Sequence, residues 1–454
     1  MSQRINRVVV VIGALFVQVV LGTVYAFSVF VKPLESTFGW NRATTQWAFS
    51  IALACFAIAM IPAGRLQDRI GPRKVAYVSA VLLGFSFVMS ALLLPLVQSP
   101  WVLYLTYGVL GGAGIGFGYV CPIAALVKWY PDKKGLITGI AVAGFGAGAL
   151  FFAGPAGELM KPPSPQGETL GLVDIILIGI GAAEGTGFGI GWQSFFLIHG
   201  IVCFLLVFLG ASLLSNPPAG WTPPIMPPQA SAQDMKRDVP PAEMLNTPLA
   251  TMLWLTFIFG ATSGLMAIGQ WTPMVAEVLK GASFAPSWLK GFGRFVEPVG
   301  ILSLFNAFGR IFWGKVSDYI DRPRAMMLMF LMQGLTCMLL LNVSSPAAVF
   351  LVSALVGLNF GGNFALFPAA TADYFGTKYL GANYGWIFTA YGVAGIIGPV
   401  AGGILYDITK QYILAFLFAG ILCFVAAGTA VVTWGLARAE QPGQANRPIV
   451  SPSS

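Results

Sequence analysis

Charged residues are scarce in this sequence, and their scarcity excludes an ordinary water-soluble protein. Only 9% of the 454 residues are Asp, Glu, Lys or Arg, whereas 57% are hydrophobic. A soluble chain of this length would carry far more charge on its surface. The mean hydropathy of +0.78 agrees with a solvent that is largely lipid. The composition therefore predicts an all-α membrane protein.

Cysteine and histidine are also rare. All five cysteines fall inside apolar runs, and the single histidine, His199, cannot form a metal cluster alone. A disulfide framework and a metal site are therefore not expected. Nor do the apolar runs contain a paired nucleophile and base, so we expect neither an enzyme nor a bound cofactor.

Long apolar runs are abundant, and each is close to the roughly 20 residues that span a bilayer. The first follows Arg4 and Arg7 but is too long for the apolar region of a signal peptide, so it is interpreted as a retained helix. Twelve spans are predicted: 8–31, 44–63, 75–97, 102–126, 136–157, 192–214, 249–276, 298–314, 325–343, 348–371, 384–406 and 411–437.

The basic residues indicate the orientation of these spans. An even number of spans places both termini on one side, and most of the 25 Lys and Arg residues fall on that side. By the positive-inside rule, both termini are predicted to be cytoplasmic in a multi-pass protein of the cell (inner) membrane. The net charge of +8 thus reports topology and does not indicate nucleic acid as a partner.

The spans divide into two six-helix halves. The first half covers 1–214 with an external insert at 158–191. The second covers 249–437 with an external insert at 277–297, and a cytoplasmic tail follows at 438–454. Between the halves, residues 215–248 are rich in proline, which prevents a continuous helix and predicts a cytoplasmic linker. Nothing in this plan requires more than a monomer.

An internal repeat supports the division into halves. GRLQDRIGPRK follows the second span and GKVSDYIDRPR follows the eighth, so that Gly64 and Asp68 recur as Gly314 and Asp318, both 250 positions later (314 − 64, 318 − 68). Gly135, Gly139 and Gly146 recur as Gly381, Gly385 and Gly392, each 246 positions later. Parallel repeats of this kind are typical of alternating-access carriers.

The repeated loop motif predicts a conformational latch between helices. A small residue allows close helix approach, and the carboxylate is expected to bind either the amide groups at a neighbouring helix N-terminus or a basic partner. Asp321 replaces the glycine of the first copy, which predicts a weaker latch in the second half. A generic basic loop that only sets topology is the alternative. The predicted latch residues are Gly64, Asp68, Arg69, Gly71, Arg73, Gly314, Asp318 and Arg324.

Arg310 is the one cation well inside an apolar run, and a buried charge in a span usually faces a cavity. It has no obvious acidic partner, so a substrate carboxylate is predicted to pair with its planar guanidinium. Asn306 lies one helical turn earlier and could hold either the guanidinium or a substrate oxygen. The alternative is that Arg310 extends to the cytoplasmic surface or binds backbone carbonyls.

Aromatic residues in other spans are predicted to share this cavity. The tyrosines are the better candidates, because each hydroxyl needs a hydrogen-bond partner in lipid surroundings. The predicted substrate-binding aromatic residues are Tyr25, Tyr119, Phe360, Phe364, Phe388 and Tyr391.

These motifs carry a resemblance to known families. GRLQDRIGPRK has the loop pattern of the major facilitator superfamily. QVVLGTVYAFSVF, GFGYVCP, KWYPDKKGLITG, FGRIFWGKVSD, NFALFPAATADYFG and GANYGWIF resemble the oxalate/formate antiporter family, which includes bacterial lactate and pyruvate carriers. The resemblance implies that Arg310 binds the substrate carboxylate, with Asn306 beside it, and that the aromatic residues named above enclose the ligand.

One departure from this family bears on the substrate. The oxalate carrier has a lysine where this chain has Tyr391, so a dianion would leave one charge unpaired here. The sequence therefore favours a small monocarboxylate such as lactate or pyruvate, carried with a proton. An oxalate/formate-type exchanger and a carboxylate sensor that does not transport remain alternatives, and the sequence does not identify a proton-carrying group.

Overall fold

The computed structural model describes residues 7–159, 191–218, 220–221, 238–279, 298–340, 343 and 345–440. All the elements in this part of the chain are helical. Most of the two predicted external inserts, the middle of the linker and nearly all of the tail lie outside the described residues.

Six membrane-length helical segments form the first half. The first is continuous through a tight 3₁₀ segment, and the fourth is continuous through a wide π-helical segment. In order they are α1 (Arg7–Leu21) with η1 (Gly22–Ala26) and α2 (Phe27–Phe38), α3 (Arg42–Ile70), α4 (Pro72–Val97), α5 (Pro100–Leu103) with η2 (Tyr104–Gly111) and α6 (Gly112–Trp129), α7 (Lys134–Leu159) and α9 (Gly191–Leu213).

The second half repeats this plan after a short helix, α10 (Pro241–Met244). Its six segments are α11 (Pro248–Leu279), α12 (Pro298–Ile320), α13 (Arg322–Leu339), α14 (Pro346–Phe375), α15 (Leu380–Thr409) and α16 (Ile413–Glu440). The twelve-helix plan predicted from the sequence is confirmed. Across the described residues, nine segments are long and apolar enough to cross a membrane on composition alone. Of the other three, α12 and α13 fall below that level because they carry Arg310, Arg322 and other charges, and α7 counts only as a shorter apolar helix, Lys134–Gly148.

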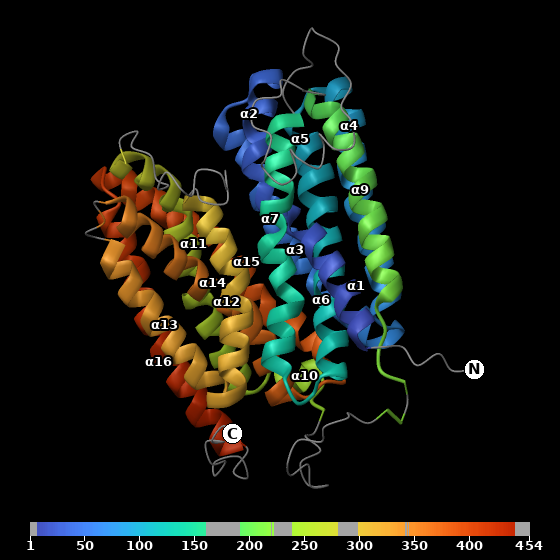
Figure 1. Ribbon diagram of the computed structural model, residues 1–454, viewed down its shortest axis with the longest axis vertical. Coiled ribbons are helices and arrows are strands. Elements are labelled where there is room, and N and C mark those ends of the chain that lie inside the picture. Colours follow the sequence, from blue (N-terminus) through green and yellow to red (C-terminus); the bar gives the residue numbers. More distant parts are fainter. Residues whose placement is uncertain are drawn as a thin grey trace.

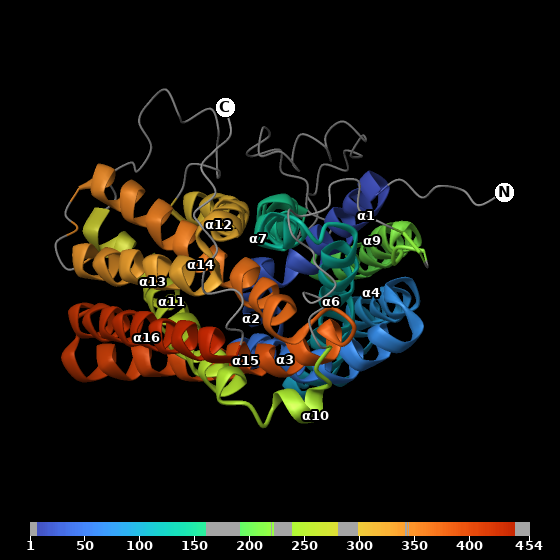
Figure 2. The same ribbon diagram turned by 90° about the horizontal axis from the view of Figure 1, so that it is seen from below.

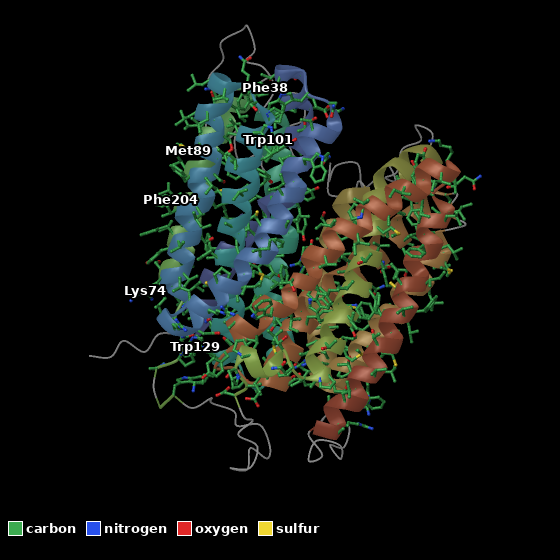
Figure 3. The ribbon with its side chains drawn as sticks, turned by 180° about the vertical axis from the view of Figure 1, so that it is seen from behind. Phe38, Lys74, Met89, Trp101, Trp129 and Phe204 are labelled. Carbon is green, nitrogen blue, oxygen red and sulfur yellow. The ribbon has the colours of Figure 1, made fainter. Side chains whose placement is uncertain are left out.

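The helices pack as two bundles, with α7 beside α12 and α3 beside α15 where the bundles meet (Figure 2). In Figure 1 the ribbons of the two bundles adjoin at the lower end and separate toward the top. That lower end, where α1 begins and α16 ends, is called the basic end below. Figure 3 places Lys74 and Trp129 there and Phe38 and Trp101 near the opposite end.

Apolar side chains cover the outer surface as well as the interior. Trp47, Ile58, Leu96 and Ile408 are each more than 60% exposed, whereas the interior faces carry buried glycine, alanine and aromatic residues. A helix that is apolar all round suits lipid on one side and packed protein on the other.

The two copies of the loop motif differ from the prediction in one respect. Residues 64–70 and 314–320 are not loops but the last turns of α3 and α12, and only Gly71 and Asp321 break the helices. Both have a positive φ, 89° at Gly71 and 76° at Asp321. The helices continue because the glycine and the aspartate of each motif, one turn apart, must face the same neighbouring helix.

The described part of the predicted linker packs against the second half. Asp238 accepts hydrogen bonds from the amides of Thr377 and Lys378, at 3.1 and 3.0 Å. The amide of Val239 donates to the carbonyl of Phe375, and the Asn383 side chain donates to the carbonyl of Val239. This segment therefore fixes the connection between α14 and α15.

Candidate functional site

Arg310 lies on α12 where the two halves meet, and its side chain is fully buried. Its Nε donates to Oδ1 of Asn306 at 3.0 Å, and its Nη1 donates to the carbonyl of Val142, on α7, at 2.7 Å. Its Nη2 has no hydrogen-bond partner among the described residues. Arg310 thus binds a backbone carbonyl, as the alternative expected, but it does not extend to the surface.

The surroundings of this cation are aromatic. The guanidinium carbon lies 4.3 Å from the centre of the Phe364 ring and 5.6 Å from that of Phe145. Ring faces attract a cation, so they partly compensate for the lost water. No ion pair of the described residues includes Arg310, and a low-dielectric cation without a counter-ion is a strong attractor for an anion.

The structure brings the predicted aromatic residues together around Arg310. Phe364 contacts Tyr391 with ring centres 5.2 Å apart, and Tyr391 is at the same distance from Phe388. Phe388 lies 5.4 Å from Tyr119, and Phe360 lies 5.5 Å from Phe364. These residues come from α6, α14 and α15, so both halves contribute.

Tyr25 joins the same cluster from η1. Its hydroxyl lies 3.2 Å from that of Tyr391, which makes a hydrogen bond between the two halves. The guanidinium of Arg310 also interacts electrostatically with the Tyr25 hydroxyl. All eight predicted substrate-binding residues therefore lie in one cluster.

The predicted latch residues lie at the basic end. Two of them, Asp68 and Asp318, each bind a helix of the opposite half. The carboxylate of Asp68, on α3, accepts from the amides of Gly381 and Ala382 at 3.2 and 2.8 Å. The carboxylate of Asp318, on α12, accepts from the amides of Gly135 and Leu136 at 2.9 and 2.8 Å. Each aspartate thus binds the N-terminus of a helix in the other half, where the helix dipole favours a negative charge.

Glycines allow the backbones to approach beside each aspartate. A Cβ added to Gly64 would lie 2.0 Å from the carbonyl oxygen of Gly381, and one added to Gly135 would lie 2.2 Å from that of Gly314. Any side chain at these positions would separate the helices. The two interfaces are therefore equivalent in geometry.

Asp321 does not disrupt the second contact. The bonds to Asp318 are as short as those to Asp68, and Asp321 accepts a hydrogen bond from the amide of Arg324 at 3.0 Å, which caps α13. Asp318 is further paired with Arg322 at 2.7 Å, and Arg322 with Asp373 at 2.7 Å. The geometry gives no sign of the weaker contact that the substitution at this position suggested.

The remaining latch residues are peripheral to these contacts. The Nε of Arg73 donates to the carbonyl of Leu214 at 3.1 Å, within the first half. Arg324 lies over the ring of Trp434, within the second half. Arg69 is exposed on the last turn of α3. None of these three forms a described contact between the halves.

The chain, whose twelve helices form two halves joined by a repeated pair of interfaces, matches a known protein family. The family model described as "Major Facilitator Superfamily" matches residues 13–296 and 298–451. The chain belongs to the major facilitator superfamily. It is therefore a member of a family of membrane transporters.

The relatives of this chain include members of the family that its motifs resemble. The chain is 28% identical over 442 residues to the oxalate:formate antiporter of Oxalobacter formigenes, and the match covers 95% of this chain and 92% of that protein. It is 25% identical over 373 residues to the apicoplast pyruvate carrier 1 of Toxoplasma gondii, covering 76% and 66%. The crystal structure of FucP in the outward conformation has the same fold, with a TM-score of 0.64, 13% identity and coverage of 95% and 99%.

Three further residues of the cluster around Arg310 were not predicted from the sequence. Phe145 lies 5.2 Å from Tyr25 and 5.0 Å from Tyr119, between ring centres. Phe56 lies 4.9 Å from Phe388, and Tyr384 lies 5.6 Å from Phe388. Tyr384 could have been found, because it shares a face of α15 with Phe388 and Tyr391 by helical spacing. Phe145 and Phe56 carry no signal that distinguishes them among 35 phenylalanines.

Proposed function

We propose that this facilitator carries a small monocarboxylate of the lactate or pyruvate type across the cell membrane by alternating access, together with a proton. The observation that supports the proposal best is Arg310. It is a fully buried cation between the halves, its Nη2 is unpartnered, and no described carboxylate pairs with it. A substrate carboxylate supplies the missing charge.

The substrate class follows from the number of charges. One guanidinium balances one carboxylate, and the rest of the cluster consists of phenylalanine rings, tyrosine hydroxyls and Asn306. A second carboxylate would enter low dielectric without a cation, which is unfavourable. The pyruvate carrier among the relatives supports a monocarboxylate as the transported class.

The direction of access follows from the contacts at the basic end. Both aspartate contacts and both glycine contacts join the halves there, so we propose that this is the cytoplasmic end and that it is closed in this state. The positive-inside bias of the sequence supports the same orientation, with both termini in the cytoplasm.

Anion exchange is the second candidate, and the relationship to the oxalate:formate antiporter favours it. The two are separated by uptake of labelled lactate into proteoliposomes, with an imposed proton gradient or with an anion preloaded inside. Uptake that requires the proton gradient supports symport, and uptake that requires the internal anion supports exchange. Unlabelled pyruvate, formate and oxalate, used as competitors, rank the substrates.

Arg310 variants test the site in the same vesicles. Arg310→Ala removes the partner of the substrate carboxylate, so kcat/KM should fall by about 30-fold or more, as for a truncated buried charge pair. Arg310→Lys keeps the charge but loses the planar fork that matches a carboxylate, so we expect about a 10-fold loss. Lys74→Arg, at an exposed position on α4, serves as the control. Lactate uptake at the wild-type rate by a correctly inserted Arg310→Ala protein would contradict the assignment.

A further inference from the structure

Three buried polar atoms in and beside the predicted substrate cluster lack a hydrogen bond of normal geometry among the described residues. They are Nη2 of Arg310 and the hydroxyls of Tyr119 and Tyr384. Both tyrosines are fully buried. The Tyr119 hydroxyl lies close enough to the Tyr384 hydroxyl and to the Arg310 guanidinium for weak hydrogen-bond interactions, so the three groups lie near one another.

Packing holds the two tyrosines in this arrangement. The ring of Phe388 lies 5.4 Å from Tyr119 and 5.6 Å from Tyr384, so that it is flanked by both. Tyr119 comes from α6 in the first half, whereas Tyr384 and Arg310 come from the second. Tyr25 and Tyr391, in contrast, hydrogen-bond to each other. Their hydroxyls share a hydrogen bond of normal geometry without a ligand, and those of Tyr119 and Tyr384 do not.

Unpartnered buried donors are unfavourable, and a protein retains them where a ligand completes them. The donors here are the two N–H groups of Nη2 and the two phenolic O–H groups. A carboxylate has two oxygens with about four acceptor positions, so one carboxylate can accept from all of them.

We infer that Tyr384 is a substrate-binding residue, which with Tyr119 and Nη2 of Arg310 binds the carboxylate of the transported acid. The inference rests on the proposed function and adds to it the residues that contact the anion. A carboxylate held in this way bridges the halves, because Tyr119 approaches it from one side and Tyr384 and Arg310 from the other. Substrate binding then draws the two halves together at this level.

The test uses Tyr384→Phe, which removes only the hydroxyl, and Tyr107→Phe as its matched control. Tyr107 is also a buried tyrosine whose hydroxyl has no described partner, but its ring packs among Phe27, Phe30 and Phe87, within the first half. Purified wild-type and variant proteins are compared by thermal unfolding with and without lactate or pyruvate, and by the KM and kcat of uptake in proteoliposomes.

We expect Tyr384→Phe to weaken lactate binding by about 10-fold or more, the loss of one hydrogen bond to a charged group. Its ligand-free protein should unfold at the wild-type temperature or higher, because an unsatisfied hydroxyl is gone, and its lactate-induced rise in Tm should shrink. Tyr107→Phe should show the same ligand-free behaviour with an unchanged response to lactate. Tyr119→Phe should act as Tyr384→Phe does.

Three results would overturn the inference. A full lactate response in Tyr384→Phe means that the hydroxyl does not contact the substrate and that bound water satisfies it. A fall in the Tm of ligand-free Tyr384→Phe, without one in Tyr107→Phe, means that the hydroxyl has a structural role. A wild-type protein that responds to neither lactate nor pyruvate overturns the proposed function and this inference together, whereas the first two results overturn this inference alone.

Discussion

Replacing one aspartate at the basic end should shift the balance between the two states of the transporter. Asp68→Asn keeps the shape of the side chain but leaves one oxygen to accept, and it turns an NH₂ group toward the second amide of α15. The variant therefore loses at least one hydrogen bond to a charged acceptor, which contributes about 1.5–3 kcal/mol, together with the favourable charge at the helix N-terminus. Asp318→Asn should act in the same direction at α7, and it also loses the charge that pairs with Arg322.

This loss can be converted into populations. A change of about 1.5–3 kcal/mol is roughly a 10- to 150-fold change in the equilibrium constant. If the state open at the basic end is populated at about 1%, it should rise to roughly 10–60% in the single variant. The two contacts lie at separate interfaces, so their effects in the double variant should add.

Spin labels at Lys133 and Tyr319 would report this change as a distance. Both positions are exposed at the basic end, and they belong to opposite halves. Labels are attached in a protein whose five native cysteines are replaced. The distance distribution should gain a longer component in Asp68→Asn and Asp318→Asn. Asp132→Asn serves as the control, because Asp132 makes no described bond between the halves. Unchanged distributions in both variants would refute the latch.

Two further predictions concern single positions. Tyr391→Lys places a second cation beside Phe364 and Phe388, so competition by oxalate against labelled lactate should strengthen; unchanged competition would mean that the charge at this position does not select the substrate. Asp321 has a φ of 76° and a ψ of 163°, a region that favours glycine at a cost of about 1–3 kcal/mol for other residues. Asp321→Ala loses the helix cap and keeps this strain, whereas Asp321→Gly loses the cap and relieves it. Asp321→Gly should therefore unfold at the higher temperature, and the reverse order would contradict the strain.

The fold was predictable because its causes are local. Each span is a long apolar run, and each needs its backbone hydrogen bonds satisfied within itself. The helices α12 and α13 were also assigned from their apolar runs, 298–314 and 325–343, and the repeat supported a second six-helix half. Helix ends were less predictable: the motif residues 64–70 and 314–320 look polar and loop-like, yet they continue α3 and α12, because a contact with another helix determines where they end.

The candidate site was predictable where its residue types are rare in apolar runs, and it was not predictable where they are common. Arg310 stands out as a cation in an apolar run, and Asn306 follows from helical spacing. Phe56 and Phe145 do not stand out, because only the three-dimensional packing separates them from other phenylalanines. The repeat in the sequence also does not show which residues are in contact. Gly64 and Gly314 are copies of each other, but Gly64 contacts Gly381 and Gly314 contacts Gly135, each in the opposite half.

This crosswise pairing connects the aspartate contacts to the substrate site. Along one face of α7, Gly135 meets Asp318, Gly139 meets the carbonyl of Arg310, and the carbonyl of Val142 accepts from Nη1 of Arg310. A separation of α7 from α12 at the basic end must therefore strain the bond to Val142, since the same two helices carry both. If that bond breaks, a second guanidinium nitrogen becomes available to the carboxylate of the proposed substrate. At the opposite interface, between α3 and α15, the residues of the cluster are Tyr384, Phe388 and Tyr391 of α15. Opening at the basic end would thus change the partners of the Arg310 charge at one interface and of the tyrosine hydroxyls at the other.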